Sequence, residues 1–542
     1  MPTADRTLLL FNYDWDAVAH ERLARTQGHR FDEDGFDLFS FPSNARLAWF
    51  DMARFVDGLA RRAPARGWSA VVSSNEQFGA LAAALLAERM GWPGTPVAAI
   101  LACQHKFYAR QVLQRVAPEA NVAFQLLEAE YGAPIPEGLP YPLFVKPVKA
   151  AFSVLARRVD NHAELHRHTR FGAWELWVIR RLVEPFERLM RERLGPDVPS
   201  AHRMLLEPPV RADQFNLDGV VFNGDVRAIG VVDAIMFPGT QSFMRHQIPS
   251  ALPPAVQARA LDVARRFLQA VGFTHGLFNM EFFYDAATDR LSVIECNPRL
   301  ASQFSDLYQR VDGVDPHAMS LAIALGRDPL AVPRRPVTAG VAASLVYRVF
   351  PGETPPAAPG RQQLARWQGA FPDGIAMPMP KQGRSLQRDH KWTGSHRYGI
   401  VHLGAADRAA LRERAEAASA MLGWPAPWRD PAQADMPQPA KGSAGWPCDL
   451  LADVPGQPGQ GLAVGQHGIV QAGAGGRRLG DETLPLAGPN AADVAAGAAL
   501  ARAGRPAPTS PHNKIQTAIR LLMPDLQAEE HRNALTIITP LH

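Results

Sequence analysis

The sequence predicts a multidomain protein that combines the α/β and α+β fold classes and ends in a disordered tail. Its 542 residues are too many for one hydrophobic core. Strand-like and helix-like segments alternate up to about residue 105, and strands joined by short turns follow up to about residue 330. From residue 431 onward Ala, Gly and Pro replace most aromatic residues, so burial there cannot offset the entropy of ordering the chain.

The composition restricts the class of partner. With 46% hydrophobic and 20% charged residues, the chain has the composition of a soluble globular protein. Its 57 basic and 53 acidic residues are well mixed, so no basic stripe indicates nucleic acid. No apolar run is long enough to indicate a membrane span. The three cysteines lack the spacing of a disulfide framework or a zinc site, which favours a cytoplasmic protein.

Residues 1–105 are predicted to form a parallel α/β domain, because strands that alternate with helices are typical of a parallel sheet covered on both faces. The strands are expected at residues 7–11, 37–41 and 68–74, and the helices at 17–25, 45–62 and 78–90. Ligands of such sheets bind at the carboxyl ends of strands, where Ser73 to Glu76 lie. The same four residues also suit an ordinary helix N-cap.

Residues 106–330 are predicted to contain helices and short antiparallel strands. A helix is expected at residues 106–116, and strands are expected at 122–127, 141–148 and 204–210. Two longer strands, 214–222 and 226–235, are joined at Asn223 and Gly224, a pair that favours a tight hairpin turn. Apolar residues at helical spacing between Pro254 and Gly272 predict a long helix before the last hairpin.

That last hairpin is acidic and ends in the sequence ECNPR. Residues 277–283 and 291–297 are rich in strand-forming residues and flank a short loop. A pairing of Asp285 with Leu291 would place Glu281 directly opposite Glu295. Because side chains alternate along a strand, Asn297 would share their face, and Ile294 and Cys296 would point away from it.

The two facing carboxylates predict a metal site. Like charges opposite each other repel unless a cation lies between them. Mg²⁺ takes carboxylate and amide oxygens and leaves positions for phosphate and water, so Glu281, Glu295 and Asn297 suit this ion. Arg299 adds a positive charge that suits a nucleotide phosphate. The alternative, from these residues alone, is a pair of solvated acids on an exposed strand face.

Three further segments precede the acidic hairpin in order: CQHKFYAR with Lys106, LFVKPV with Lys146, and MLLEPPV with Glu207. Together with the hairpin, they resemble the ATP-grasp superfamily. The resemblance implies a Rossmann-like domain at residues 1–105, a two-lobed ATP-binding clamp at 106–330 and a small closing domain at 331–430, before the tail at 431–542. The stretches RHQIPSALP, GFTHGL and DLYQRVDGVDP are most similar to carboxylate-amine ligases that join amino acids or related acids.

The resemblance also implies roles for individual residues. The ligands of Mg²⁺, or of Mn²⁺ in its place, would be Glu281, Glu295 and Asn297. The catalytic side chains, which would act on the transferred phosphoryl group and the substrate, would be Arg299, Lys146 and Arg245. Contacts with ATP would come from Lys106, Lys146, Ser153, Glu207, Val210 and Gln214. Three features depart from the family pattern: residues 149–154 contain no glycine, Arg299 is followed by LASQ where glycines are frequent, and Gln214 stands near where an acid often contacts the ribose.

The predicted function is that of an ATP-dependent, ADP-forming carboxylate-amine ligase that works through an acyl phosphate. Its partners would be ATP, a small carboxylic acid or amino acid, and an amine acceptor. Two alternatives stay open: an enzyme of the same superfamily whose acceptor is bicarbonate, a thiol or a hydroxyl, and a nucleotide-binding regulatory protein without turnover. No GxxxxGK, HExxH or GxSxG pattern supports another enzyme class. The sequence leaves the oligomeric state open, a homodimer included.

Overall fold

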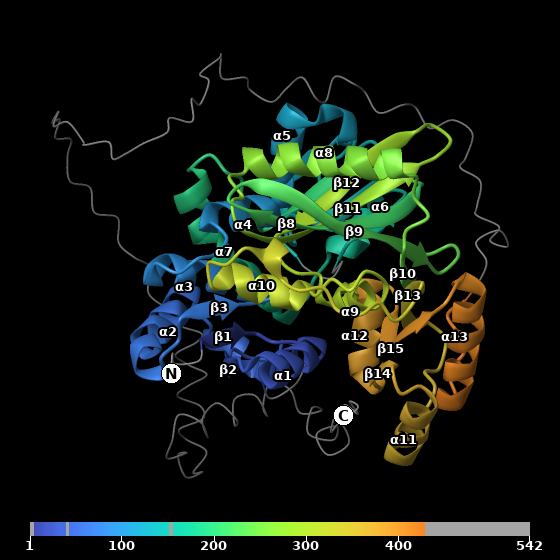
Figure 1. Ribbon diagram of the computed structural model, residues 1–542. Helices are drawn as coiled ribbons and strands as arrows, with labels where there is room; N and C mark the ends of the chain where they lie inside the picture. Colours follow the sequence, from blue (N-terminus) through green and yellow to red (C-terminus); the bar gives the residue numbers. More distant parts are fainter. Residues whose placement is uncertain (1–4, 39–42, 151–154, 429–542) are drawn as a thin grey trace, which may run out of the picture. The chain divides into compact units, whose positions relative to one another are not determined.

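The computed structural model describes residues 5–38, 43–150 and 155–428, and the predicted tail lies outside these ranges. The described residues form a mixed fold with one parallel and two antiparallel sheets (Figure 1). This confirms the predicted combination of α/β and α+β structure, whereas the domain boundaries stay predictions. Among the described helices, none is both long enough and apolar enough to cross a membrane.

The parallel sheet near the N-terminus has the strand order β2-β1-β3. Its strands are β1 (Arg6–Leu10), β2 (Arg30–Asp34) and β3 (Ala70–Val72). The helices of this region are α1 (Asp14–Gln27), the 3-10 helix η1 (Ser43–Trp49), α2 (Met52–Arg66) and α3 (Gly79–Met90). The predicted first and third strands and the predicted first and third helices are therefore confirmed within a few residues.

The prediction of a strand at residues 37–41 is wrong for its described part. The second strand lies earlier, at β2, and pairs with β1 along an edge of the sheet. An edge strand tolerates the charged sequence RFDED because one side of it faces water. The apolar side chains of Phe36 and Leu38 pack against the core from a loop. The predicted helix at 45–62 is interrupted, since η1 ends and Asp51 caps α2 by accepting a hydrogen bond from the Arg54 amide at 2.8 Å.

A four-stranded antiparallel sheet follows, with the order β4-β7-β5-β6. Its strands are β4 (Gln125–Glu130), β5 (Leu143–Pro147), β6 (Arg157–Val159) and β7 (Arg203–Glu207). The helices around it are α4 (Val97–Gln104), α5 (Lys106–Val116), the 3-10 helix η2 (Pro118–Ala120), α6 (His162–Thr169) and α7 (Ala173–Leu194). The bounds of α5 agree with the prediction.

The largest sheet has eight antiparallel strands in the order β12-β11-β8-β9-β10-β13-β15-β14. They are β8 (Asp213–Phe222), β9 (Asp225–Met236), β10 (Phe243–Ile248), β11 (Gly276–Asp285), β12 (Arg290–Asn297), β13 (Val341–Val349), β14 (Ile375–Pro378) and β15 (His396–Ala405). The remaining helices are α8 (Pro254–Ala270), α9 (Ser302–Val311), α10 (Pro316–Ala324), the 3-10 helix η3 (Pro329–Ala331), α11 (Arg361–Ala370), α12 (Gly383–Thr393) and α13 (Arg408–Leu422). The predicted β8–β9 turn is confirmed, because Asn223 and Gly224 have φ values of 51° and 80°.

The eight-stranded sheet has one apolar and one polar face around β8, β11 and β12. Phe215, Phe278 and Phe282 belong to a buried cluster with α5 and α8, and Figure 1 shows α8 lying across these strands. Residues of opposite parity therefore face the other way. They are polar, namely Gln214, Asn216, Asp218, Asn279, Glu281, Glu295 and Asn297. The predicted acidic hairpin thus presents its carboxylates on the side opposite the apolar core.

Candidate active site

The acidic hairpin pairs Glu281 with Glu295, as predicted, but it does so through a different register. The hairpin begins with Asp285 opposite Arg290, so the predicted pairing of Asp285 with Leu291 is wrong by one residue. A β-bulge then places one extra residue, Ile294, in β12 between Val293 and Glu295. The bulge restores the opposition of the two glutamates.

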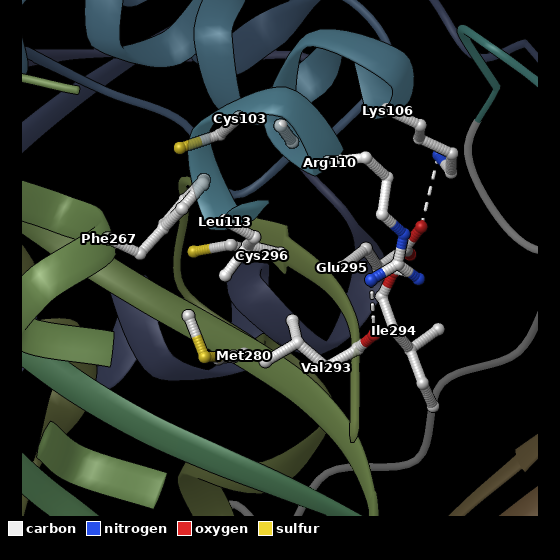
Figure 2. A pocket seen from close by; sticks show the side chains of 11 residues that line it. Cys103, Lys106, Arg110, Leu113, Phe267, Met280, Val293, Ile294, Glu295 and Cys296 are labelled. Atoms are coloured by element: carbon white, nitrogen blue, oxygen red, sulfur yellow. Dashed lines mark hydrogen bonds and ion pairs between the residues drawn. The ribbon is translucent and has the colours of Figure 1, made fainter. Parts of the chain in front are cut away.

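Two buried cations bind the backbone of this bulge. Arg110 donates from Nη1 to the Val293 carbonyl at 2.6 Å and from Nη2 to the Ile294 carbonyl at 3.1 Å. Lys146 Nζ donates to the same Ile294 carbonyl at 3.3 Å. A bulge disrupts the ladder of backbone hydrogen bonds, and these side chains supply donors in its place. Figure 2 shows Arg110 reaching from α5 to β12, so the helix fixes the position of Glu295.

Glu207 forms ion pairs with both Arg110 and Lys146. Its Oε1 lies 2.7 Å from Arg110 Nε, and its Oε2 lies 3.0 Å from Lys146 Nζ. Burial alone would raise the pKa of Glu207, but the charges of Arg110 and Lys146 outweigh it and lower that pKa. The structure therefore brings the predicted residues Lys146 and Glu207 together directly behind the acidic hairpin.

The two glutamates of the hairpin differ in their electrostatic surroundings. Lys106 forms an ion pair with Glu295 (Figure 2), in which Nζ lies 3.0 Å from Oε2. The charges of Lys106 and Lys146 lower the Glu295 pKa although burial opposes them. Burial and the facing charge of Glu295 raise the pKa of Glu281 to about 7. Within the described ranges Glu281 forms no ion pair, and the two facing carboxylates suit a divalent cation between them. Among the described residues no group of three or more His, Cys, Asp or Glu side chains could hold a metal ion, so a cation between the two glutamates would need the amide oxygen of Asn297 as a further ligand.

Asn297 is oriented by a chain of hydrogen bonds. Its Nδ2 donates to Glu281 Oε1 at 3.2 Å and to Asn279 Oδ1 at 3.3 Å. Asn279 in turn donates from Nδ2 to Asp218 Oδ1 at 2.9 Å, and the Tyr308 hydroxyl donates to Asp218 Oδ2 at 2.8 Å. Since Asp218 accepts from Asn279, the latter must present its oxygen to Asn297. Asn297 therefore donates with its nitrogen and keeps its Oδ1 for a cation.

Replacing Asp218 with asparagine is expected to raise the Mg²⁺ concentration needed for half-maximal ATP turnover by about 10-fold to 100-fold, because partners of metal ligands have effects of that size. The exchanged pair Asp218→Asn with Asn279→Asp reverses the hydrogen bond between these two residues, but residue 279 still accepts from Asn297 Nδ2, so the pair should recover most of the loss. Mg²⁺ titrations of the three variants at fixed ATP would measure this. Equal losses in the single and paired variants would contradict the orienting role.

Arg299 contacts Glu76, which follows the carboxyl end of β3 in the parallel sheet. Its Nε lies 3.1 Å from Glu76 Oε2, and Lys149 Nζ donates to the Glu76 carbonyl at 3.4 Å. Asn75 Oδ1, next to Glu76, accepts hydrogen bonds from the backbone amides of Phe78 and Gly79. Asn75 therefore accepts hydrogen bonds from the backbone at the start of α3, and Glu76 contacts Arg299, while ligand binding by this segment stays a prediction.

The other predicted site residues are divided between the two faces of the sheet. Gln214 Nε2 donates to Glu281 Oε2 at 2.9 Å, so Gln214 lies beside the acidic pair. Val210 follows β7 and is half-buried. Arg245 pairs with Leu345, whose side chain belongs to the apolar cluster of α11 and α13, and the Arg245 guanidinium lies 4.0 Å from the centre of the Trp428 ring. The structure does not bring Arg245 to the acidic hairpin, because strand alternation points it to the opposite face. Ser153 lies outside the described residues.

His246, the neighbour of Arg245, lies on the polar face and is buried. Its ring centroid lies 4.8 Å from those of Phe243 and Phe304. Burial, followed by the charge of Arg348, lowers the pKa of His246 to about 3. The imidazole is therefore neutral at neutral pH.

The depressed pKa of His246 predicts a loss of stability in acid. A group with a lowered folded pKa contributes stability above its unfolded pKa, about 6.5, and loses it as the pH falls toward about 3. Relative to His246→Phe, the wild-type protein should lose about 2 kcal/mol of unfolding free energy between pH 7 and pH 5. Denaturant unfolding of both proteins at the two pH values would measure the difference, and a difference that does not change with pH would contradict a buried, neutral His246.

Sequence reasoning missed Arg110, Asp218 and Lys149, and it named Glu76 without its contact to Arg299. Arg110 follows Lys106 by four residues on α5, which places both side chains on one face of that helix, and this spacing was the available signal. Asp218 has the same parity along β8 as Gln214, and Asn279 has the same parity along β11 as Glu281. Strand alternation therefore already predicted that these side chains share the polar face. Glu76 and Lys149 come from distant segments, and only the tertiary structure joins them to Arg299.

Comparisons with known proteins place this geometry in context. No protein-family model matches the chain. It is 30% identical over 266 residues to carnosine synthase 1 of Gallus gallus, an alignment that covers 47% of this chain and 27% of the other. It is 30% identical over 192 residues to D-alanine–D-alanine ligase of Gluconobacter oxydans, covering 32% of this chain and 55% of the other. The chain thus spans from about a quarter to about half of the length of these curated relatives.

The fold has a solved counterpart. The crystal structure of L-amino acid ligase from Bacillus licheniformis superimposes with a TM-score of 0.57 at 15% sequence identity, covering 78% of this chain and 98% of the other. An identity this low supports the fold alone. The fold and the two sequence similarities confirm the resemblance predicted from the order of the motifs: the chain has the fold of the ATP-grasp ligases and is related in sequence to ligases of that superfamily.

Proposed function

We propose that the chain is an ATP-dependent, ADP-forming ligase that joins a carboxylic acid to an amine. The observation that carries this proposal is the pairing of Glu281 with Glu295 on a hairpin that Lys106 and Lys146 contact, with Arg299 just after it. Lys106 contacts Glu295 directly, and Lys146 lies behind the same strand. Negative side chains that suit a divalent cation and positive side chains that suit phosphate therefore converge on one hairpin.

ATP and Mg²⁺ would occupy this hairpin together. The pKa of Glu281 is raised, and Asn297 donates with Nδ2, so that its Oδ1 can accept a cation. Both features fit a divalent cation held by Glu281, Glu295 and Asn297. When bound, Mg²⁺ would offset the negative charge of the phosphates during phosphoryl transfer. Lys106, which contacts Glu295 in the structure, would contact a phosphate oxygen of bound ATP instead. The segment from Glu207 to Val210, at the end of β7, would hold the adenine.

The protein's side chains would act mainly through charge and position. A carboxylate oxygen of the acid attacks the γ-phosphorus of ATP, the bond to ADP breaks, and an acyl phosphate forms. The amine nitrogen then attacks the acyl carbon, phosphate leaves, and a proton passes from nitrogen to solvent. Arg299 would contact the transferred phosphoryl group after leaving Glu76, so that no covalent bond to the protein is required.

A substrate panel tests the proposal. Purified protein would be incubated with ATP, Mg²⁺ and pairs of amino acids, and the release of ADP and phosphate would be followed. ADP and phosphate should appear in equal amounts, and only when both an acid and an amine are present. Release with bicarbonate, thiols or alcohols in place of the amine would favour a different acceptor. ATP binding without turnover across the whole panel would overturn the ligase function.

A further inference from the structure

Two arginines face each other on the last strands of the eight-stranded sheet. Arg348 of β13 lies directly opposite Arg397 of β15. The register shifts beside this pair, which leaves Tyr398 as the extra residue of a bulge and turns it into the apolar cluster with Tyr347. The bulge therefore turns Arg397 away from that cluster, toward the side where Arg348 lies.

This arrangement is unfavourable unless an anion lies between the two guanidinium groups, because like charges directly opposite each other in a sheet are destabilising. Arg348 donates only to neutral groups, namely the Phe243 carbonyl at 3.1 Å and the Ser395 hydroxyl at 2.9 Å. Within the described ranges neither arginine has a carboxylate partner. Asp389, whose charge acts on both, is already 3.1 Å from Lys381 Nζ and 2.9 Å from His396 Nδ1.

Both side chains of the pair are half-buried, and the Asp389 charge that acts on them is shared with Lys381 and His396. Burial and the charge of Arg397 lower the pKa of Arg348 to about 9, and burial lowers the pKa of Arg397 as well. Arg397 makes no hydrogen bond within the described ranges, and a guanidinium with free donors in a partly dry place is suited to bind a carboxylate through two parallel hydrogen bonds. The two groups together are thus a prepared site for one anion.

Trp15 of α1 links the arginine pair to the segment that follows Arg299. The Arg397 guanidinium lies 6.0 Å from the centre of the Trp15 ring. Trp15 Nε1 donates to the Ser302 hydroxyl at 3.0 Å, and Ser302 follows Arg299 by three residues. Tyr13, whose ring centroid lies 5.6 Å from that of Trp15, is close enough to Arg299 for that charge to lower its pKa, although burial raises it overall. Arg397 and Arg299 therefore both lie within electrostatic reach of Tyr13.

We propose that Arg348 and Arg397 form a subsite for the carboxylate of an amino acid that serves as the amine acceptor. The inference rests on the proposed ligase function and names its acceptor class. Three strands separate β13 from β11, about 19 Å between their backbones, so a carboxylate held here is not the one that receives the phosphoryl group at Glu281. An amino-acid acceptor carries such a second, unreacting carboxylate. Its amine attacks the acyl carbon, phosphate leaves, and the carboxylate stays unchanged on the arginines.

Substitution of Arg397 tests the subsite, because this side chain makes no hydrogen bond within the described ranges that its loss would break. Arg397→Gln should raise the KM for an amino-acid acceptor by about 10-fold to 100-fold and leave the KM for ATP unchanged. Arg397→Lys should recover part of the loss. Arg361→Gln, which changes an exposed arginine at the start of α11, is the matched control and should behave as the wild-type protein.

The probes are the L-amino acids and D-alanine, each as the free acid and as its carboxamide. In the wild-type protein the carboxamides should have the raised KM, and Arg397→Gln should no longer distinguish the two forms. Equal KM values for acid and carboxamide in the wild-type protein, together with normal ADP release, would overturn the subsite while the ligase function stands.

A binding assay separates the two proposals. Amino acids would be titrated calorimetrically into the protein with ADP and Mg²⁺ present, so that no turnover is needed. Binding of the free acids that Arg397→Gln removes, in a protein that turns over no substrate pair, would support the subsite and reject the ligase function. If none of these amino acids binds to the wild-type protein, the subsite is overturned as well.

Discussion

Replacement of Glu295 with alanine is expected to lower Mg²⁺-dependent ADP release by about 10³-fold. The substitution removes one of the two facing carboxylates and leaves Lys106 without its partner, so that a divalent cation loses a charged ligand. Charge stabilisation by a bound metal ion amounts to several kcal/mol, and about 4 kcal/mol corresponds to this factor. Initial rates of ADP release at saturating ATP and increasing Mg²⁺ would measure the effect.

A control in the same hairpin separates the chemistry from folding. Asp285 lies at the loop end of β11, where its carboxylate accepts hydrogen bonds from Ala287 and Thr288. Asp285→Asn keeps one acceptor oxygen and should retain the wild-type rate. If Glu295→Ala folds normally and keeps more than about a tenth of the rate, the acidic pair is not the metal site.

Replacement of Arg110 with methionine is expected to lower the free energy of unfolding by about 3–5 kcal/mol, because it removes one partner of a buried ion pair. Arg110 and Glu207 are 3% and 5% exposed, and Arg110 also holds two carbonyls of the β12 bulge. Methionine fills similar space without supplying a donor. The loss should extend to ADP release, since the bulge sets Glu295 opposite Glu281.

Denaturant unfolding of Arg110→Met and of a control on the same helix would test this effect. Arg115, five residues later on α5, is exposed, and Arg115→Met should change the unfolding free energy by less than about 0.5 kcal/mol. A loss below about 1 kcal/mol in Arg110→Met would show that water or Lys146 replaces the missing donors, and that the bulge does not depend on Arg110.

The sequence was most informative where local patterns determine structure. Strand alternation and turn residues were sufficient to predict the β8–β9 hairpin, the bounds of α5 and the opposition of Glu281 to Glu295. The last of these agreed although the predicted register was wrong, because the bulge at Ile294 compensated for a loop one residue shorter. A bulge depends on donors from another element, here Arg110, and such contacts are not visible in the sequence of the hairpin itself.

The remaining differences have similar causes. Strand β2 was missed because an edge strand needs few apolar residues. The apolar residues that suggested a strand at 37–41 include Leu38, which, like Phe36, packs against the core from a loop. Arg245 was predicted at the site, but its position on β10 places its side chain on the face with Trp428. The facing pair of Arg348 and Arg397 arises from a second bulge, and only the paired strands reveal it.

The path of an oxygen atom tests the proposed mechanism most directly. An amino acid labelled with ¹⁸O in its carboxyl group would be joined to an amine in the presence of ATP and Mg²⁺, and the products would be analysed by mass spectrometry. Attack of the carboxylate on the γ-phosphorus predicts one ¹⁸O atom in the inorganic phosphate for each amide formed, and none in ADP. Label in AMP, or unlabelled phosphate alongside the amide product, would contradict an acyl phosphate formed at the acidic hairpin.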